Sequence, residues 1–200
     1  MSEISHANAA FRRLASPKPQ TTEADIQADV RDFILHSDLG LTEAQLDTVG
    51  LEVYAGSANR IDIQVAHAVI EVKRSLDATK TLLDGEKQLA RYLQARAIDG
   101  TLYAGVLTDG RKWNLYTLKG EEIVAVAHLS VGESDEARLR YWLEDIFAMT
   151  RNVTPTKRTV EQLLGYRSIT YGIDFQSLMG LWLENADNPE LQLKKELWGK

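Results

Sequence analysis

The chain has 200 residues, of which 44% are hydrophobic, and a formal net charge of −6. This length allows one domain with an appendage or two small domains, and no run approaches the ~18 consecutive apolar residues of a membrane span. The absence of cysteine excludes a disulfide framework, a thiolate zinc site and a cysteine nucleophile. The acidic charge disfavours a dedicated nucleic-acid binder, although Lys and Arg residues between positions 73 and 112 leave room for a basic groove.

Residues 1–20 contain two adjacent arginines and a Pro-Lys-Pro segment, but no apolar stretch of the signal-peptide type. We therefore expect a flexible N-terminal arm on a cytoplasmic protein. A first helix is predicted from residue 21 or 22 to about 35, because Asp25 completes a capping-box pattern with Thr22. Glu23 falls within the apolar stripe of this helix, where a carboxylate is costly unless it is capped, paired or bound to a metal. Glu23 is thus a candidate site residue, the alternative being a frayed helix end.

The segment 60–74 contains two β-branched runs, 60–65 and 69–74, joined by a tight connection, which predicts a hairpin. It carries Asp62, Glu71 and Lys73 where a structural strand would place apolar residues. Side chains alternate along a strand, so Glu71 and Lys73 share one face. Asp62 joins them if the turn lies at 66–67 or at 67–68, and points away if Asp62 pairs with Val72.

Carboxylates on directly paired residues lie about 5 Å apart and repel each other unless a cation or a shared proton lies between them. Magnesium is usually held by one or two carboxylates together with waters and substrate phosphates. A lysine beside such a cation can orient a water molecule or offset the charge that develops on a phosphodiester. The hairpin therefore predicts a divalent-cation site at Asp62 and Glu71, with Lys73 beside it. The alternative is an exposed hairpin with a surface ion pair.

Helical and extended patterns alternate along the rest of the first 150 residues. We expect a strand at 49–55 before the hairpin, a helix at 86–97 after it, and further strands at 101–108, 113–118 and 123–129. The Asp-Gly pair at 109–110 is a strong hairpin signal. The order of one helix, three strands, one helix and three strands predicts a mixed sheet flanked by helices.

The predicted helix at 86–97 carries a polar set beside its buried row. Gln88 and Tyr92 are spaced i, i+4, with Arg91 adjacent. Such side chains can contact a phosphate or stack on a base. The alternative makes Tyr92 a core aromatic and Gln88 a surface residue.

The last quarter of the chain changes character after Asn-Val-Thr-Pro at 152–155. Residues 151–200 are predicted to form a helical connector, whose last apolar residues have no visible partners. The simplest interpretation is a further domain beyond Lys200. A self-association surface, and with it an oligomer, would give the same pattern.

The hairpin motif resembles the signature of the PD-(D/E)XK nuclease superfamily. Asp62, eight intervening residues and then Glu71, Val72 and Lys73 fit the D…(D/E)-x-K pattern. The proline that names the signature is absent, because Ile61 precedes Asp62. The resemblance implies an α/β fold with a restriction-endonuclease-like αβββαβ core over 21–150, followed by the helical extension.

The helix motif looks like the Q-x-x-x-Y motif of the RecB-like members of that superfamily. Together the two motifs imply Mg²⁺ as the cofactor, with Mn²⁺ as a substitute. The implied roles are catalysis by Asp62, Glu71 and Lys73, metal binding by Asp62, Glu71, Glu23 and Val72, and substrate binding by Gln88, Tyr92 and Arg91.

Two further segments, 22–27 and 105–113, resemble the N-terminal nuclease domains of type I restriction subunits and of restriction enzymes fused to an N6-adenine methyltransferase. The resemblance implies a Mg²⁺-dependent DNA endonuclease domain of a restriction-modification or phage-defence enzyme. It also implies a covalently linked methyltransferase or helicase domain beyond Lys200. The alternative is a catalytically silent nuclease-fold module that binds DNA or assembles a larger defence complex.

Overall fold

The computed structural model describes residues 3–47, 49–54, 60–96 and 103–148, together with a few single positions between 165 and 179. The chain divides into two compact units, Met1–Val153 and Thr154–Lys200. Nearly all of the helical connector predicted over 151–200 lies outside the described residues. Among the residues that are described, no helix has the length and apolar character needed to cross a membrane.

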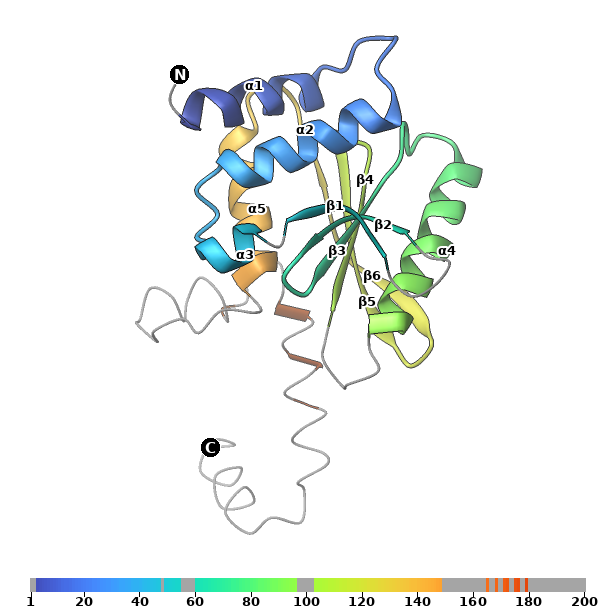
Figure 1. The fold of residues 1–200 in the computed structure, drawn as a ribbon. Coiled ribbons are helices and arrows are strands. Elements are labelled where there is room, and N and C mark those ends of the chain that lie inside the picture. Colours follow the sequence, from blue (N-terminus) through green and yellow to red (C-terminus); the bar gives the residue numbers. More distant parts are fainter. Residues whose placement is uncertain are drawn as a thin grey trace. The chain divides into compact units, whose positions relative to one another are not determined.

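The first unit is built around one mixed sheet (Figure 1). Its elements in chain order are α1 (Glu3–Ala15), α2 (Glu23–His36), α3 (Glu43–Asp47), β1 (Gly50–Tyr54), β2 (Arg60–Val65), β3 (Ala68–Val72), α4 (Thr79–Arg96), β4 (Ala104–Thr108), β5 (Lys112–Lys119), β6 (Glu122–Ser130) and α5 (Glu136–Ala148). The six strands lie in the order β1-β2-β3-β4-β5-β6. Strands β3 and β4 pair in parallel, and the other neighbours are antiparallel. The predicted mixed sheet flanked by helices is confirmed.

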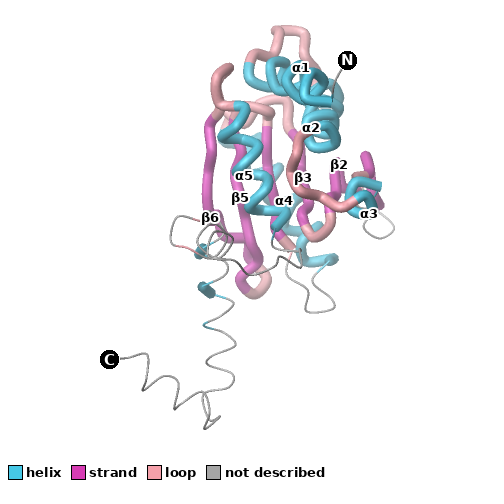
Figure 2. The backbone as a smooth tube through the Cα atoms, turned by 90° about the vertical axis from the view of Figure 1, so that its left-hand side faces the viewer, coloured by secondary structure: helices cyan, strands magenta, loops and turns pink. Residues whose placement is uncertain are grey.

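Helix α4 is the crossover between the parallel strands and packs on the sheet at close range. A Cβ atom at Gly105 of β4 would lie 2.8 Å from a Leu93 methyl and 2.9 Å from Leu89. The missing side chain therefore lets α4 approach the strand. On the α5 side of the sheet, the ring of Trp113 contacts the ring of Trp142, with centroids 6.3 Å apart. Figures 1 and 2 show α1 and α2 side by side at one end of the sheet.

The N-terminal segment forms a packed helix, so the prediction of a flexible arm over residues 1–20 is wrong. Helix α1 buries Ala7, Ala10, Phe11 and Leu14, which recur at helical spacing. The rings of Phe11 and Phe33 lie 5.9 Å apart, centroid to centroid. Half of this stripe is alanine, which contributes little hydrophobicity. The sequence pattern therefore does not predict the helix.

The start of α2 agrees with the sequence prediction, whereas the start of α4 does not. Helix α2 begins as predicted, with both hydrogen bonds of the Thr22 and Asp25 capping box present. Helix α4 begins at Thr79, well before the predicted start at Glu86. Gly85, which directly precedes the predicted start, lies inside the helix. A Cβ atom there would meet Leu107 at 2.8 Å, so this glycine serves packing and does not mark a turn.

Candidate active site

The register of the β2–β3 hairpin determines which side chains share a face. The turn lies at 66–67, with Ala66 at a φ of 48°, and the paired residues run from Val65 and Ala68 to Ile63 and Ile70. Continued by one step, this register places Asp62 directly opposite Glu71. This is the arrangement predicted for a turn at 66–67, and Asp62 does not pair with Val72.

Hydrogen bonds from the end of β3 hold the carboxylate pair, which we define as Asp62 and Glu71. The N–H of Val72 donates to Asp62 Oδ2 at 2.8 Å, so a side-chain oxygen replaces a main-chain partner. Lys73 Nζ lies 2.5 Å from Glu71 Oε1. The N–H of Lys73 donates to the carbonyl of Thr108 in β4 at 2.8 Å. The structure therefore brings the two predicted acids and the predicted lysine together.

Glu71 is the most deeply buried acid of the site. Its exposed fraction is 1%, and its Oε2 has no hydrogen-bond partner among the residues that the structure describes. Burial, followed by repulsion from Asp62, raises the pKa of Glu71 to about 7 despite the nearby Lys73 ammonium. Burial also raises the pKa of Asp62, against the effect of the Val72 N–H. One buried and one partly buried carboxylate beside a single lysine form an environment that a further cation would stabilise.

The raised pKa of Glu71 predicts a loss of stability with rising pH. The folded state binds this proton more tightly than the unfolded state, whose carboxyl has the ordinary pKa of 4.5. The stabilisation is therefore complete below pH 4.5 and is lost as the pH rises through about 7, at a cost of about 3 kcal/mol. Urea unfolding of the protein in EDTA across this range should show that loss, and Glu71→Gln should lack it. Equal pH slopes for the two proteins would contradict the assignment.

Glu23 reaches the site from the start of α2. Its Oε2 accepts the N–H of Arg74 at 3.1 Å, and its charge raises the pKa of both Asp62 and Glu71. Glu23 itself is exposed and therefore borders the carboxylate pair from the solvent side. It lies at the N-terminal edge of the helix stripe, which explains why it is not buried as the helix pattern suggested.

The donor atoms at the site are oxygens. Within the described ranges, no three His, Cys, Asp or Glu side chains are arranged as a metal-binding group. The side chains that could hold a cation are therefore those of the carboxylate pair. Val72 has a buried side chain without a donor atom and could contribute only its main-chain carbonyl. Carboxylate and carbonyl oxygens suit Mg²⁺, and the unpartnered Oε2 of Glu71 fits a ligand position.

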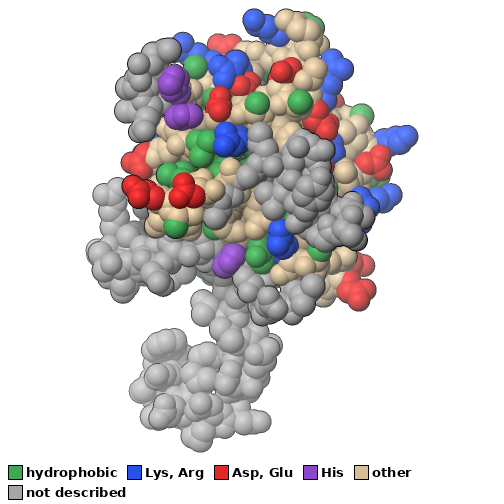
Figure 3. All heavy atoms as spheres, viewed as in Figure 1, with side chains coloured by type: hydrophobic (Ala, Val, Ile, Leu, Met, Phe, Trp, Pro, Cys, Tyr) green, Lys and Arg blue, Asp and Glu red, His purple; other side chains and the backbone are tan. Residues whose placement is uncertain are grey.

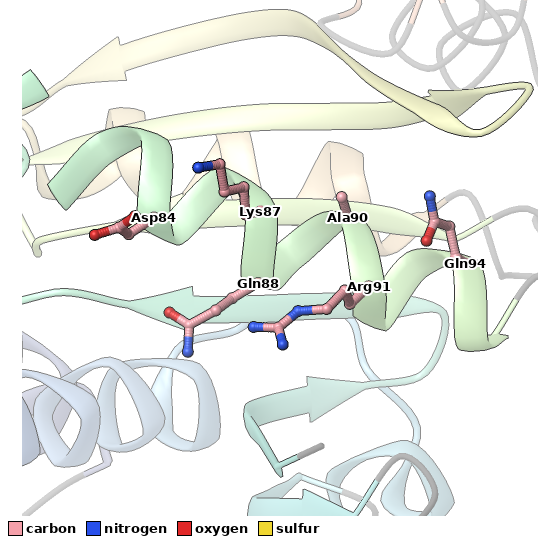
Figure 4. Close-up of a pocket in the computed structure, with 6 residues that line it drawn as sticks. All are labelled: Asp84, Lys87, Gln88, Ala90, Arg91 and Gln94. Carbon is pink, nitrogen blue, oxygen red and sulfur yellow. The ribbon is translucent and has the colours of Figure 1, made fainter. Parts of the chain in front are cut away.

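Helix α4 contributes the predicted polar set at the flank of the site. Tyr92 is 4% exposed, and burial together with the Glu71 and Asp62 charges raises its pKa to about 12. It is therefore both a core aromatic and a neighbour of the carboxylate pair, and its hydroxyl stays protonated at neutral pH. Gln88 and Arg91 line a shallow groove on α4 and project from one side of the helix, whereas Lys87 and Gln94 point to the other (Figure 4).

The charges around α4 are mixed. Lys and Arg side chains gather over α4 at the right of Figure 3, with Asp and Glu side chains between them. On the helix itself Lys80, Lys87 and Arg91 are exposed, and so is Asp84. The surface beside the site is therefore locally more basic than the acidic net charge of the chain.

Two residues that support the site were not found from the sequence. Gln27 Nε2 donates to the main-chain carbonyl of Asp62 at 2.9 Å. Asp109 Oδ2 accepts the N–H of Leu76 at 2.8 Å and so anchors the segment that follows Lys73. The spacing of Gln27 from Glu23, i and i+4, could have indicated a shared role, whereas the contact of Asp109 is long-range and left no local signal.

Comparison of the chain with protein-family models, with curated proteins and with solved structures finds no match. The features that bear on function are therefore the arrangement of Asp62, Glu71 and Lys73 and the sequence resemblance that these residues carry.

Proposed function

We propose that the first unit is a Mg²⁺-dependent DNA endonuclease domain of a restriction-modification or phage-defence enzyme. The observation that carries the proposal is the buried Glu71 carboxylate, which lies opposite Asp62 and 2.5 Å from Lys73 Nζ. The element order α2-α3-β1-β2-β3-α4-β4 supports it, because apart from the five-residue helix α3 it follows the αβββαβ order that the resemblance implies. We further propose a cytoplasmic location and a covalently linked methyltransferase or helicase domain.

The carboxylate pair and the Val72 carbonyl would hold the cation, with Glu23 beside them. When bound, Mg²⁺ or Mn²⁺ supplies Lewis-acid polarisation of the phosphodiester and a water of lowered pKa. The raised pKa of Glu71 favours this role, because its ionised form lacks compensation by the protein alone.

Lys73 assists the hydrolysis from its position beside Glu71. In this reaction a water oxygen bonds to phosphorus, the ester bond to the leaving oxygen breaks, and a proton from the water passes to the leaving oxygen. The Lys73 side chain is only 13% exposed, so its charge acts in a partly desolvated site. There it orients the attacking water and stabilises the charge that develops on the phosphate oxygens.

The side chains of α4 bind the substrate next to the carboxylate pair. The Gln88 amide and the Arg91 guanidinium can hydrogen-bond to phosphate oxygens, and the protonated Tyr92 hydroxyl can donate to one. These phosphate contacts would position the DNA strand, but they do not distinguish one base sequence from another. Recognition of a sequence would come from a linked domain.

Metal titration separates this function from a catalytically silent module. Calorimetry should show Mg²⁺ and Mn²⁺ binding to the protein, and Asp62→Asn should abolish it. Asp38→Asn, which alters an exposed aspartate of the loop after α2, should bind both metals as the unaltered protein does. Metal binding that does not depend on Asp62, or no binding at all, would favour the silent module.

A further inference from the structure

Asp62 is held at two points. Its carboxylate accepts the N–H of Val72 at 2.8 Å, while its main-chain carbonyl accepts Gln27 Nε2 at 2.9 Å. The first contact comes from the neighbouring strand β3 and the second from α2. Gln27 is partly buried, and its amide therefore has less access to alternative water partners.

The same helix also holds the segment that directly follows strand β3. Glu23 accepts the N–H of Arg74, which directly follows Lys73. Glu23 and Gln27 are separated by one helical turn and lie on the same side of α2. One turn of α2 thus contacts both β2 and the end of β3, at the point where the main-chain pairing of these strands has ended.

We propose that Gln27 is a positioning residue, which fixes the distance between the Asp62 carboxylate and Glu71 by holding the main chain of β2. This inference rests on the proposed nuclease function. Its physical basis is that groups which orient a metal ligand affect metal affinity and turnover without touching the substrate. A misplacement of about 1 Å is enough to lower the rate by about 10²-fold.

The test is to replace Gln27 by Met, which keeps the length of the side chain and removes the donor. We expect Gln27→Met to lower kcat by about 10-fold to 100-fold with an unchanged KM for DNA. Calorimetry should show a weaker affinity for Mg²⁺ by a factor of similar size. Gln27→Asn keeps an amide on a side chain that is too short to reach Asp62, so it should show the same effects. If Gln27→Met does not fold, Gln27→Asn still tests the proposal.

Gln94 provides a matched control. Its Nε2 also donates from a helix to a main-chain carbonyl, that of Glu121 in the β5–β6 turn. Gln94→Met should therefore lose a comparable hydrogen bond and retain the metal affinity and kcat of the unaltered protein. An equal loss in Gln94→Met and Gln27→Met would overturn the positioning role.

The two proposals fail in different ways. If the unaltered protein neither binds Mg²⁺ nor cleaves DNA, the nuclease function fails, and the positioning role fails with it. If the unaltered protein does both, and Asp62→Asn does neither, but both Gln27 variants behave as the unaltered protein, then only the positioning role is overturned.

Discussion

Asp62→Asn is expected to lower Mg²⁺-dependent cleavage of plasmid DNA by at least about 10³-fold, the scale of losing a preorganised charged group. The fold should survive, because the Asn carbonyl can still accept the N–H of Val72. Removal of the Asp62 charge also removes a cause of the raised pKa of Glu71. The midpoint of thermal unfolding should therefore stay unchanged or rise, because the repulsion between the two carboxylates is removed.

Plasmid nicking and thermal unfolding, measured on the same preparation, check both parts of this expectation. Asp38→Asn serves again as the control, because it removes one exposed carboxylate and should change neither measurement. Cleavage by Asp62→Asn at the rate of the unaltered protein would refute the active site. A variant that is inactive because it is unfolded would be recognised by its missing thermal transition.

Lys73→Met is expected to lower kcat by about 10²-fold to 10³-fold while Mg²⁺ binding is retained. In the proposed mechanism the lysine acts on the attacking water and on the phosphate and does not hold the cation, so catalysis and metal binding should be affected separately. Its loss leaves Glu71 without its positive partner, so the pKa of Glu71 should rise further. The variant should therefore be more stable at pH 6 than at pH 8, because a carboxyl whose pKa is raised in the folded state stabilises that state only while it is protonated.

Lys112→Met is the matched control for this variant, because Lys112 Nζ lies 2.7 Å from Asp77 in an exposed pair. Such a pair is screened by solvent and contributes little to stability, and the variant should cleave DNA normally. Single-turnover cleavage together with calorimetry distinguishes the two variants. Loss of metal binding in Lys73→Met would show that the lysine is needed to form the site itself.

The sequence predicted the strands of the site better than their surroundings. Strand alternation alone places Glu71 and Lys73 on one face, and the capping box placed the start of α2. The position of Asp62 depended on the turn, and the structure uses Ala66 at positive φ, for which a non-glycine residue gives no local signal.

The features that the sequence did not predict correctly depend on contacts between segments that are distant in the chain. Gly85 resembled a helix start because its role, making room for Leu107, is visible only when α4 lies on β4. Helix α1 was missed because an alanine-rich stripe gains its stabilisation from packing on α2 and little from its own hydrophobicity. Gln27 has no intrinsic chemistry of a catalytic kind, so its role depends on the carbonyl that it contacts.

The hydrogen bond from the Lys73 amide to Thr108 has a consequence for biosynthesis. The two acids meet within a local hairpin, which can form within microseconds once both of its strands are free. The lysine main chain obtains its partner only after α4 and β4 have been synthesised and the slower parallel pairing is complete. A nascent chain that ends before residue 108 therefore carries the acids without an aligned lysine main chain, and the proposed active site is completed only after β4 has been synthesised.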